Sequence, residues 1–316
     1  MTLSVIIPTK DREEDLLITM QSLLCQTHLP DEVIIIDQSQ EDCEEEILKL
    51  MQDGPVKVKY LRDRQISGQT EARARGLKEA KGDIIFFLDD DITLDRHCIE
   101  NLLQTYKENP HLGGICAVDM ATENMGLFRL LMTSLFACGP FSGKKGGWFY
   151  TDLLVHRFHK RLRGLYYTWA FFGGFMSFRR QVVEEIGFDE RLKGQVFAED
   201  IDLAFRVSEK YPLALAPGVK VLHREGKALY SPRWAFERRV HARWYFFIKN
   251  VDKTPINILC FLWALVGLLL SATVSAVASR SLDPVRGFLS AVQTASTGNS
   301  THFPAKGALS GKGKST

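Results

Sequence analysis

The feature that most constrains the fold is the alternation of short apolar runs with amphipathic segments between residues 3 and 88. The apolar runs at 3–7, 33–36 and 84–88 and the alternating segment 56–61 read as strands, and the segments at 12–26, 41–51 and 69–80 read as helices. Apolar strands that alternate with helices pair in parallel and are covered on both faces. The pattern therefore predicts a Rossmann-like α/β fold with a mostly parallel central sheet.

Two of the predicted strands end in acidic residues. Asp37 follows the second strand, and Asp89, Asp90 and Asp91 follow the fourth. Ligands of parallel sheets bind at the carboxyl ends of the strands, and confined carboxylates repel one another unless a cation offsets their charge. Oxygen ligands suit Mg²⁺ or Mn²⁺. The other interpretation is a solvated acidic turn before a helix, and the run alone does not decide between the two.

Three further groups carry potential chemistry. Glu199 and Asp200 precede an amphipathic helix; such a pair either caps the helix or supplies a general base, and by itself the pattern favours capping. Arg73 lies on the helix before the acid-bearing strand, and arginine suits phosphate. Gly173 and Gly174 either allow a close approach of the backbone to a ligand or mark a bend in a strand.

The C-terminal part of the chain contains a long uncharged segment. Residues 256–278 carry no charge, and about 20 apolar residues suffice to span a bilayer as a helix. Basic residues cluster just before this segment, which places that flank in the cytoplasm; they are Arg233, Arg238, Arg239, Arg243, Lys249 and Lys253. We expect a single-pass protein of the cell membrane, without a signal peptide.

The same patterns suggest the domain organisation. We expect a cytoplasmic catalytic domain at 1–250, a transmembrane helix at 254–279 and a disordered tail at 280–316, which ends in a stretch rich in Gly, Ser, Thr and Lys. The net charge of +2 provides no general field for nucleic acid. The six cysteines form no C-x-x-C pair, which disfavours zinc and favours free thiols in a reducing compartment.

In their order and spacing, these pieces resemble the family 2 glycosyltransferases, which have a GT-A fold. The resemblance covers roughly residues 2–250, and its most specific part is the stretch 82–91 that ends in the three aspartates. It also includes residues 5–12, the strand ending at Asp37, the element 72–76, the segment 173–180 and the Glu199-Asp200 pair. In the element 72–76, Ala74 stands where the family usually has Asn.

The resemblance implies a role for each matching residue. The donor-binding residues would be Pro8, Thr9, Arg12, Asp37, Arg73, Asp89 and Asp90. A divalent cation, Mn²⁺ or Mg²⁺, would be held by Asp91, with Asp89 and His223 as further ligands. Asp200 would be the general base beside Glu199, and the acceptor side would include Gly173, Gly174, Arg243 and Trp244.

The implied reaction is the inverting transfer of one sugar from a nucleotide-sugar donor, a UDP- or dTDP-sugar, to a lipid-linked or envelope glycan acceptor. The Arg243-Trp244 pair matches only part of the motif of processive members, and a single membrane helix is too few for a polysaccharide channel.

Three different functions compete with this interpretation. A haloacid-dehalogenase-like phosphatase would use Asp89 as its nucleophile, although that motif usually lies on the first strand of its domain. A nucleotidyltransferase would also need acids and a metal, but residues 8–11 lack the glycine of its phosphate loop. A non-enzymatic membrane scaffold would bind no nucleotide in a metal-dependent way.

Overall fold

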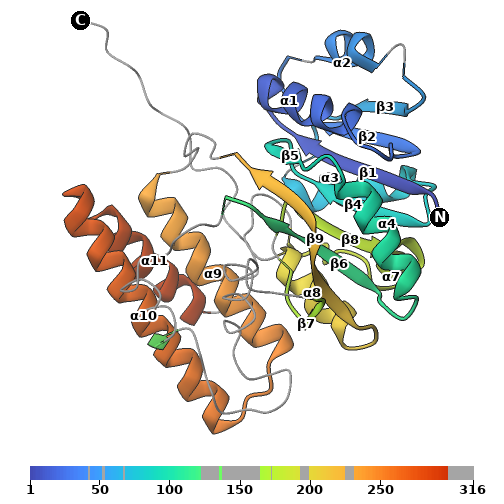
Figure 1. Ribbon diagram of the computed structural model, residues 1–316. Coiled ribbons are helices and arrows are strands. Elements are labelled where there is room, and N and C mark those ends of the chain that lie inside the picture. The colour runs from blue at the N-terminus through green and yellow to red at the C-terminus, as the bar shows by residue number, and fades with distance from the viewer. Residues whose placement is uncertain are drawn as a thin grey trace, which may run out of the picture.

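The computed structural model describes residues 1–121, 135–136, 164–192, 199–224 and 231–297, except residues 42, 52–53, 67 and 172. Within these residues, a sheet with its covering helices forms one unit, which we call the sheet unit. Three long helices form a second unit beside it, which we call the helical unit (Figure 1).

The first half of the sheet is parallel. Its strands are β1 (Leu3–Thr9), β2 (Glu32–Asp37), β3 (Lys57–Arg62) and β4 (Ile84–Leu88), in the spatial order β3-β2-β1-β4. The helices α1 (Glu13–Leu24), α2 (Glu44–Met51) and α3 (Gln69–Glu79) connect them. Every residue of β1 and β4 is buried, as expected for central strands covered on both faces. The alternation predicted from the sequence is confirmed here.

The second half of the sheet is mixed. Its strands are β5 (Ile92–Leu94), β6 (Gly114–Asp119), β7 (Tyr166–Thr168), β8 (Phe175–Arg179) and β9 (Leu213–His223). The β8 strand pairs antiparallel with both β4 and β6, whereas β6 and β9 are parallel. The helices of this half are α4 (Cys98–Glu108), α7 (Arg180–Ile186) and α8 (Glu199–Ser208). The sheet is therefore less parallel than predicted, because a hydrophobic pattern identifies a strand but not the direction of its partner.

The helical unit consists of α9 (Pro232–Asn250), α10 (Pro255–Ser279) and α11 (Asp283–Ser296), which share one apolar core. Ser231 and Thr254 cap α9 and α10, and in each case a proline follows at the first helical position. The predicted disorder is wrong for the α11 part of 280–316. Its apolar residues recur at helical spacing, and Phe288, Ala291 and Ala295 are buried. Residues 298–316 of the predicted tail lie outside the described residues.

Candidate active site

Acidic side chains gather at the carboxyl ends of β1, β2 and β4, as the sequence predicts. Thr9 at the end of β1 donates a hydrogen bond to Asp90 Oδ2 over 2.8 Å. Arg12 reaches the same place from just before α1: its Nη1 lies 3.0 Å from Asp90 Oδ1 and 2.9 Å from Asp91 Oδ2. Burial raises the pKa of Asp90 to about 7, although Arg12 and Thr9 act in the opposite direction.

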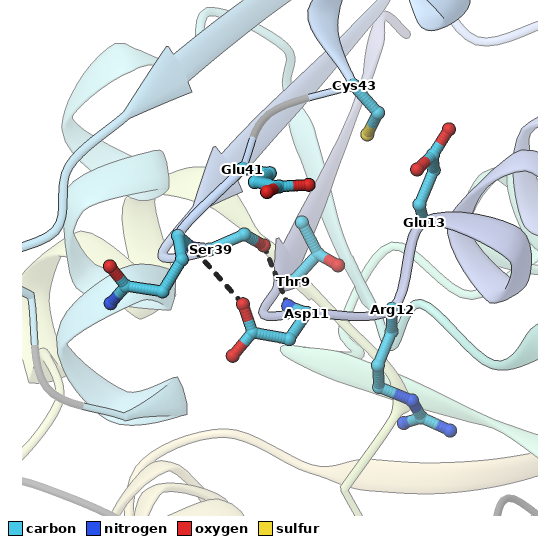
Figure 2. Close-up of a pocket in the computed structure, with 8 residues that line it drawn as sticks. Thr9, Asp11, Arg12, Glu13, Ser39, Glu41 and Cys43 are labelled. Atoms are coloured by element: carbon cyan, nitrogen blue, oxygen red, sulfur yellow. Dashed lines mark hydrogen bonds between the residues drawn. The ribbon is translucent and has the colours of Figure 1, made fainter.

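A pocket of about 310 Å³ lies beside this group, between the loops that follow β1 and β2. It is lined by Thr9, Asp11, Arg12, Glu13, Ser39, Gln40, Glu41 and Cys43 (Figure 2). The two loops are joined by hydrogen bonds: Asp11 N donates to Ser39 Oγ over 2.7 Å, and Gln40 N donates to Asp11 Oδ1 over 3.1 Å. Asp11 has a φ of 53°, a left-handed conformation that aspartate tolerates better than most residues.

Asp37 is the last residue of β2 and is 1% exposed. Its Oδ1 accepts a hydrogen bond from Ser39 N over 2.8 Å, and its Oδ2 accepts one from Tyr60 Oη over 2.6 Å. Both carboxylate oxygens therefore already hold the pocket loop and β3 in place. A direct contact between Asp37 and a nucleotide base stays a prediction.

Arg73 connects the aspartate run to the start of α8. Its side chain is fully buried; Nη2 lies 2.7 Å from Asp89 Oδ1, and Nη1 lies 3.0 Å from Glu199 Oε1. Burial acts to lower the pKa of Arg73, but Asp89 and Glu199 outweigh it, so the guanidinium stays charged. One arginine thus holds together two acids that are far apart in the sequence.

Asp200 lies next to Glu199 at the first turn of α8 and is also buried. Its Oδ2 accepts a hydrogen bond from Gly173 N, and its Oδ1 accepts one from Ile201 N over 2.8 Å. Burial raises the pKa of Asp200 and raises that of Glu199 to about 8, against the influence of Arg73. A buried carboxylate with a raised pKa is a stronger base than an exposed one, which suits it to accept a proton.

The two glycines before β8 bring the ends of the site together. Gly174 O accepts a hydrogen bond from Asp89 N over 2.8 Å, while Gly173 contacts Asp200. A Cβ atom on Gly174 would lie 2.8 Å from Asp89 Oδ2, closer than real Cβ contacts allow. A side chain at position 174 would therefore displace the Asp89 carboxylate.

Asp91 and His223 form the best candidate for a metal site. His223 Nε2, at the end of β9, lies 3.3 Å from Asp91 Oδ1, and within the described structure this buried oxygen has no hydrogen-bond partner. Burial acts to raise the pKa of Asp91, but His223 and Arg12 outweigh it and the net shift is downward. Among the described residues, no group of three or more His, Cys, Asp or Glu side chains forms a complete metal site.

Two protein ligands are compatible with Mg²⁺ or Mn²⁺ when substrate phosphates complete the coordination shell. Asp91 Oδ1, a buried oxygen without a hydrogen-bond partner beside an imidazole, fits such an ion. Asp89 is only partly exposed, with 16% of its side chain accessible, and one of its oxygens is already engaged by Arg73. Its place in the metal shell stays a prediction.

Arg243 and Trp244 lie on α9, in the helical unit. The Trp244 ring packs edge-on against Phe261 of α10, with 5.2 Å between the ring centroids. Arg243 Nη1 donates to Arg239 O over 3.2 Å. These contacts account for part of the environment of both side chains, and their role on the acceptor side stays a prediction.

Sequence reasoning missed two residues that support the site. Asp119 ends β6 and its Oδ1 accepts a hydrogen bond from His223 N over 3.0 Å. Its position, an acid directly after an apolar run, is the same signal that singled out Asp37. Arg224 holds the backbone of the aspartate run, because its Nη2 donates to Asp90 O over 3.1 Å and its N donates to Asp91 O over 3.0 Å. Nothing in the local sequence indicates that role.

Comparison with known protein sequences gives consistent results. A family model described as glycosyl transferase family 2 matches residues 4–187. An uncharacterised glycosyltransferase of Haemophilus influenzae is 34% identical over 113 residues, 36% of this chain and 37% of the relative. A GalNAc(5)-diNAcBac-PP-undecaprenol beta-1,3-glucosyltransferase of Campylobacter jejuni is 29% identical over 119 residues, 37% of this chain and 38% of the relative. The matches thus span less than two fifths of these relatives' lengths.

Solved structures resemble the chain over most of its length. A mannosyltransferase of Pyrobaculum calidifontis, in complex with GDP-Man and Mn²⁺, has a TM-score of 0.58 at 16% identity and covers 93% of this chain and 86% of that one. S. aureus TarS 1–349, in complex with UDP-GlcNAc, has a TM-score of 0.53 at 17% identity and covers 94% and 92%. At such identities the likeness shows the fold alone. It confirms the predicted GT-A fold.

Proposed function

The chain belongs to glycosyltransferase family 2, and from that premise we propose that it transfers a single sugar from a nucleotide sugar to an acceptor hydroxyl with inversion. The observation that carries the proposal is the buried Arg73 bridge. It connects Asp89, on the donor side, to the Glu199-Asp200 pair, on the side of the proposed base. These two ion pairs support the proposal that the donor side and the base side belong to one site.

The pocket beside β1 and β2 is our candidate for the nucleoside. Its acidic lining, with Asp11, Glu13 and Glu41, suits the N–H and O–H donors of a base and ribose but repels phosphate. The diphosphate would then extend away from these acids toward Arg12, at the edge of the pocket next to Asp91. UDP and dTDP are the nucleotides we propose, in line with the sequence prediction.

A divalent cation, Mn²⁺ or Mg²⁺, fits beside Asp91 Oδ1 and His223 Nε2. When bound, it would neutralise charge on the diphosphate leaving group. The guanidinium of Arg12 would add positive charge at the same place, because it lies 2.9 Å from Asp91 Oδ2. The mannosyltransferase from P. calidifontis was solved with Mn²⁺, which agrees with a metal in this fold.

Asp200 is the proposed general base. In the reaction, the acceptor oxygen forms a bond to the anomeric carbon while the bond from that carbon to the diphosphate oxygen breaks. The hydroxyl proton passes to a carboxylate oxygen of Asp200. The N–H groups of Gly173 and Ile201 fix the orientation of this carboxylate. Attack from the face opposite the leaving group inverts the anomeric configuration.

We further propose a lipid-linked or envelope glycan acceptor at a membrane, with the sheet unit in the cytoplasm. In the described part of the chain, α10 is long and apolar enough to cross a membrane. The C. jejuni relative carries the name of an enzyme that acts on an undecaprenol-linked sugar. Both observations support an acceptor presented at a lipid surface.

The phosphatase interpretation has no support. The Asp89 carboxylate lies in an ion pair with Arg73, and β4 is the fourth strand of its unit. The family match also includes the aspartate run.

A donor screen tests the proposal. The purified protein is incubated with UDP-, dTDP- and GDP-sugars and a mixture of lipid-linked acceptors, with and without Mn²⁺, and nucleotide release is measured. We expect release from one donor, dependent on the cation, and a product whose anomeric configuration by NMR is opposite to that of the donor. Retention of configuration would exclude Asp200 as the base of a single displacement.

A further inference from the structure

Helix α10 has two different faces. One face packs into the core of the helical unit through Phe261, Ala264, Leu265, Leu268 and Ala272. The opposite face is an exposed apolar stripe, made of Leu259, Leu262, Val266, Leu270, Val274 and Val277. Near its two ends, Leu259 is 65% exposed and Val277 is 75% exposed. Among the described residues, Leu135 and Phe136 contact the helix on the side of Trp263 and Gly267.

The three helices lie side by side rather than end to end (Figure 1). Phe247 near the end of α9 stacks on Phe261 near the start of α10, with ring centroids 4.3 Å apart. On α11, Thr294 Oγ1 lies 2.8 Å from His241 Nε2 of α9. Gly287 lies so close to α9 that a Cβ atom would be 2.2 Å from Arg233 O. If α10 entered a bilayer in this arrangement, α9 would have to enter it to the same depth.

Helix α9 is not suited to that depth. It carries charged residues from its first turn to its last, including the exposed Arg233 and Arg239. At its C-terminal end, Lys249 Nζ lies 2.7 Å from Asp202 Oδ1 and thereby fastens the helix to α8 of the sheet unit. Charges at the centre of a bilayer are costly unless they are neutralised or reach water. A crossing by α10 would have to separate it from α9 and expose their common core.

The positive net charge of the helical unit favours an anionic partner. Residues 232–296 contain eight Lys and Arg against three Asp and Glu, a net charge of +5, whereas the whole chain has +2. The rest of the chain therefore has a net charge of −3. A basic unit that presents a long apolar stripe fits the surface of an anionic bilayer.

We propose that α10 lies in the plane of an anionic lipid surface, with the apolar stripe inserted at the boundary of headgroups and acyl chains. This replaces the single crossing predicted from the sequence. The sequence pattern could not separate the two orientations, because a helix that crosses the bilayer and one that lies in its plane can have the same length and the same lack of charge. The observation that distinguishes them is that α10 shares one apolar core with α9 and α11. The proposal does not depend on the reaction.

Flotation of the purified full-length chain with vesicles tests the attachment. We expect the chain to float with vesicles of phosphatidylcholine and phosphatidylglycerol, and less with phosphatidylcholine alone. Replacing two stripe residues, Val266→Lys with Leu270→Lys, should reduce partitioning at least about tenfold. The control Leu48→Lys, at a 45% exposed apolar residue on α2, should leave partitioning unchanged. Equal flotation of both variants, or none by the parent chain, would overturn the proposal. So would a dimer that the stripe variant dissociates.

Accessibility of the two ends of α10 tests the orientation. Asp252→Cys and Leu282→Cys flank the helix, and the exposed Cys25 marks the side of the sheet unit. The variants are bound to sealed vesicles, treated with a membrane-impermeant maleimide and mapped by peptide mass spectrometry. An in-plane helix leaves both engineered cysteines reactive together with Cys25. Protection of position 282 alone would show a crossing and refute the proposal.

Discussion

Replacing Arg73 with methionine should be one of the most damaging single substitutions in the sheet unit. The guanidinium is fully buried and its two terminal nitrogens contact Asp89 at 2.7 Å and Glu199 at 3.0 Å. Methionine fills a similar volume but leaves the buried Glu199 carboxyl group and the partly buried Asp89 carboxylate without their cation. Removing one partner of a buried ion pair costs about 3–5 kcal/mol of the free energy of unfolding.

This cost converts into a measurable change in melting temperature. For a unit of this size, about 2–4 °C are lost per kcal/mol, so Arg73→Met should lower the Tm by about 6–20 °C. The Tm of Arg73→Lys should lie between the Tm of the parent chain and that of Arg73→Met, since one ammonium group cannot span both carboxylates as the planar guanidinium does. Calorimetry or a thermal shift assay on the purified variants measures the difference.

The matched control is Arg75→Met on the same helix. Arg75 is 45% exposed and its ion pair with Glu79, 2.7 Å long, is of the i,i+4 type. Such surface pairs contribute only about 0.3–0.5 kcal/mol, which corresponds to a Tm change of less than about 2 °C. Similar small effects for Arg73→Met and Arg75→Met would show that the bridge does not hold the site together.

Three further predictions follow from the contacts of the site. Gly174→Ala should reduce turnover, because its Cβ would press on Asp89, whereas Gly164→Ala, whose Cβ meets nothing within 4 Å, should have no effect; steady-state kinetics of the pair decides this. Lys249→Met should destabilise the protein by about 2–4 kcal/mol in urea unfolding, because it removes the cation that the Asp189 and Asp202 carboxylates share. The control is Lys210→Met, which removes the exposed ion pair with Glu185 and should change the free energy of unfolding little. The free energy of unfolding of the metal-free protein should fall as pH rises from about 5 to 8. Burial raises the pKa of Asp90 to about 7 and that of Glu199 to about 8, so the folded state binds more protons than the unfolded state in this range. The raised pKa of His223, paired with Asp91, acts in the same direction, while the lowered pKa of His241 opposes it below 6.5. Urea titrations at several pH values would contradict this if stability rose steadily.

The parallel half of the sheet was predictable because local sequence determines it. β1, β2 and β4 contain continuous apolar runs, and β3 alternates. A helix connects each successive pair of these strands, and strands joined by such helical crossovers pair in parallel. The antiparallel insertion of β8 between β4 and β6 was not predictable, since it joins segments far apart in the chain. The helix α11 was missed for another reason: composition suggested disorder, although its apolar spacing favoured a helix.

The candidate site likewise has residues that local sequence predicts and roles that only tertiary contacts reveal. Residues at the ends of strands, such as Asp37 and Asp89, were found because an acid after an apolar run is a local signal. The bridging role of Arg73 between Asp89 and Glu199 depends on tertiary contacts and could not be derived from spacing alone. Arg224 is similar, because it acts through backbone oxygens that no sequence pattern marks.

The central claim is that donor binding and proton removal belong to two different ends of one site. The most direct test is to measure both quantities on Asp200→Asn: the Kd for the donor with Mn²⁺ by calorimetry, and the turnover by nucleotide release. The account predicts a Kd close to that of the parent chain and a turnover reduced by about 10²–10⁴. Unchanged turnover in Asp200→Asn, or loss of donor binding in a variant that remains folded, would contradict it.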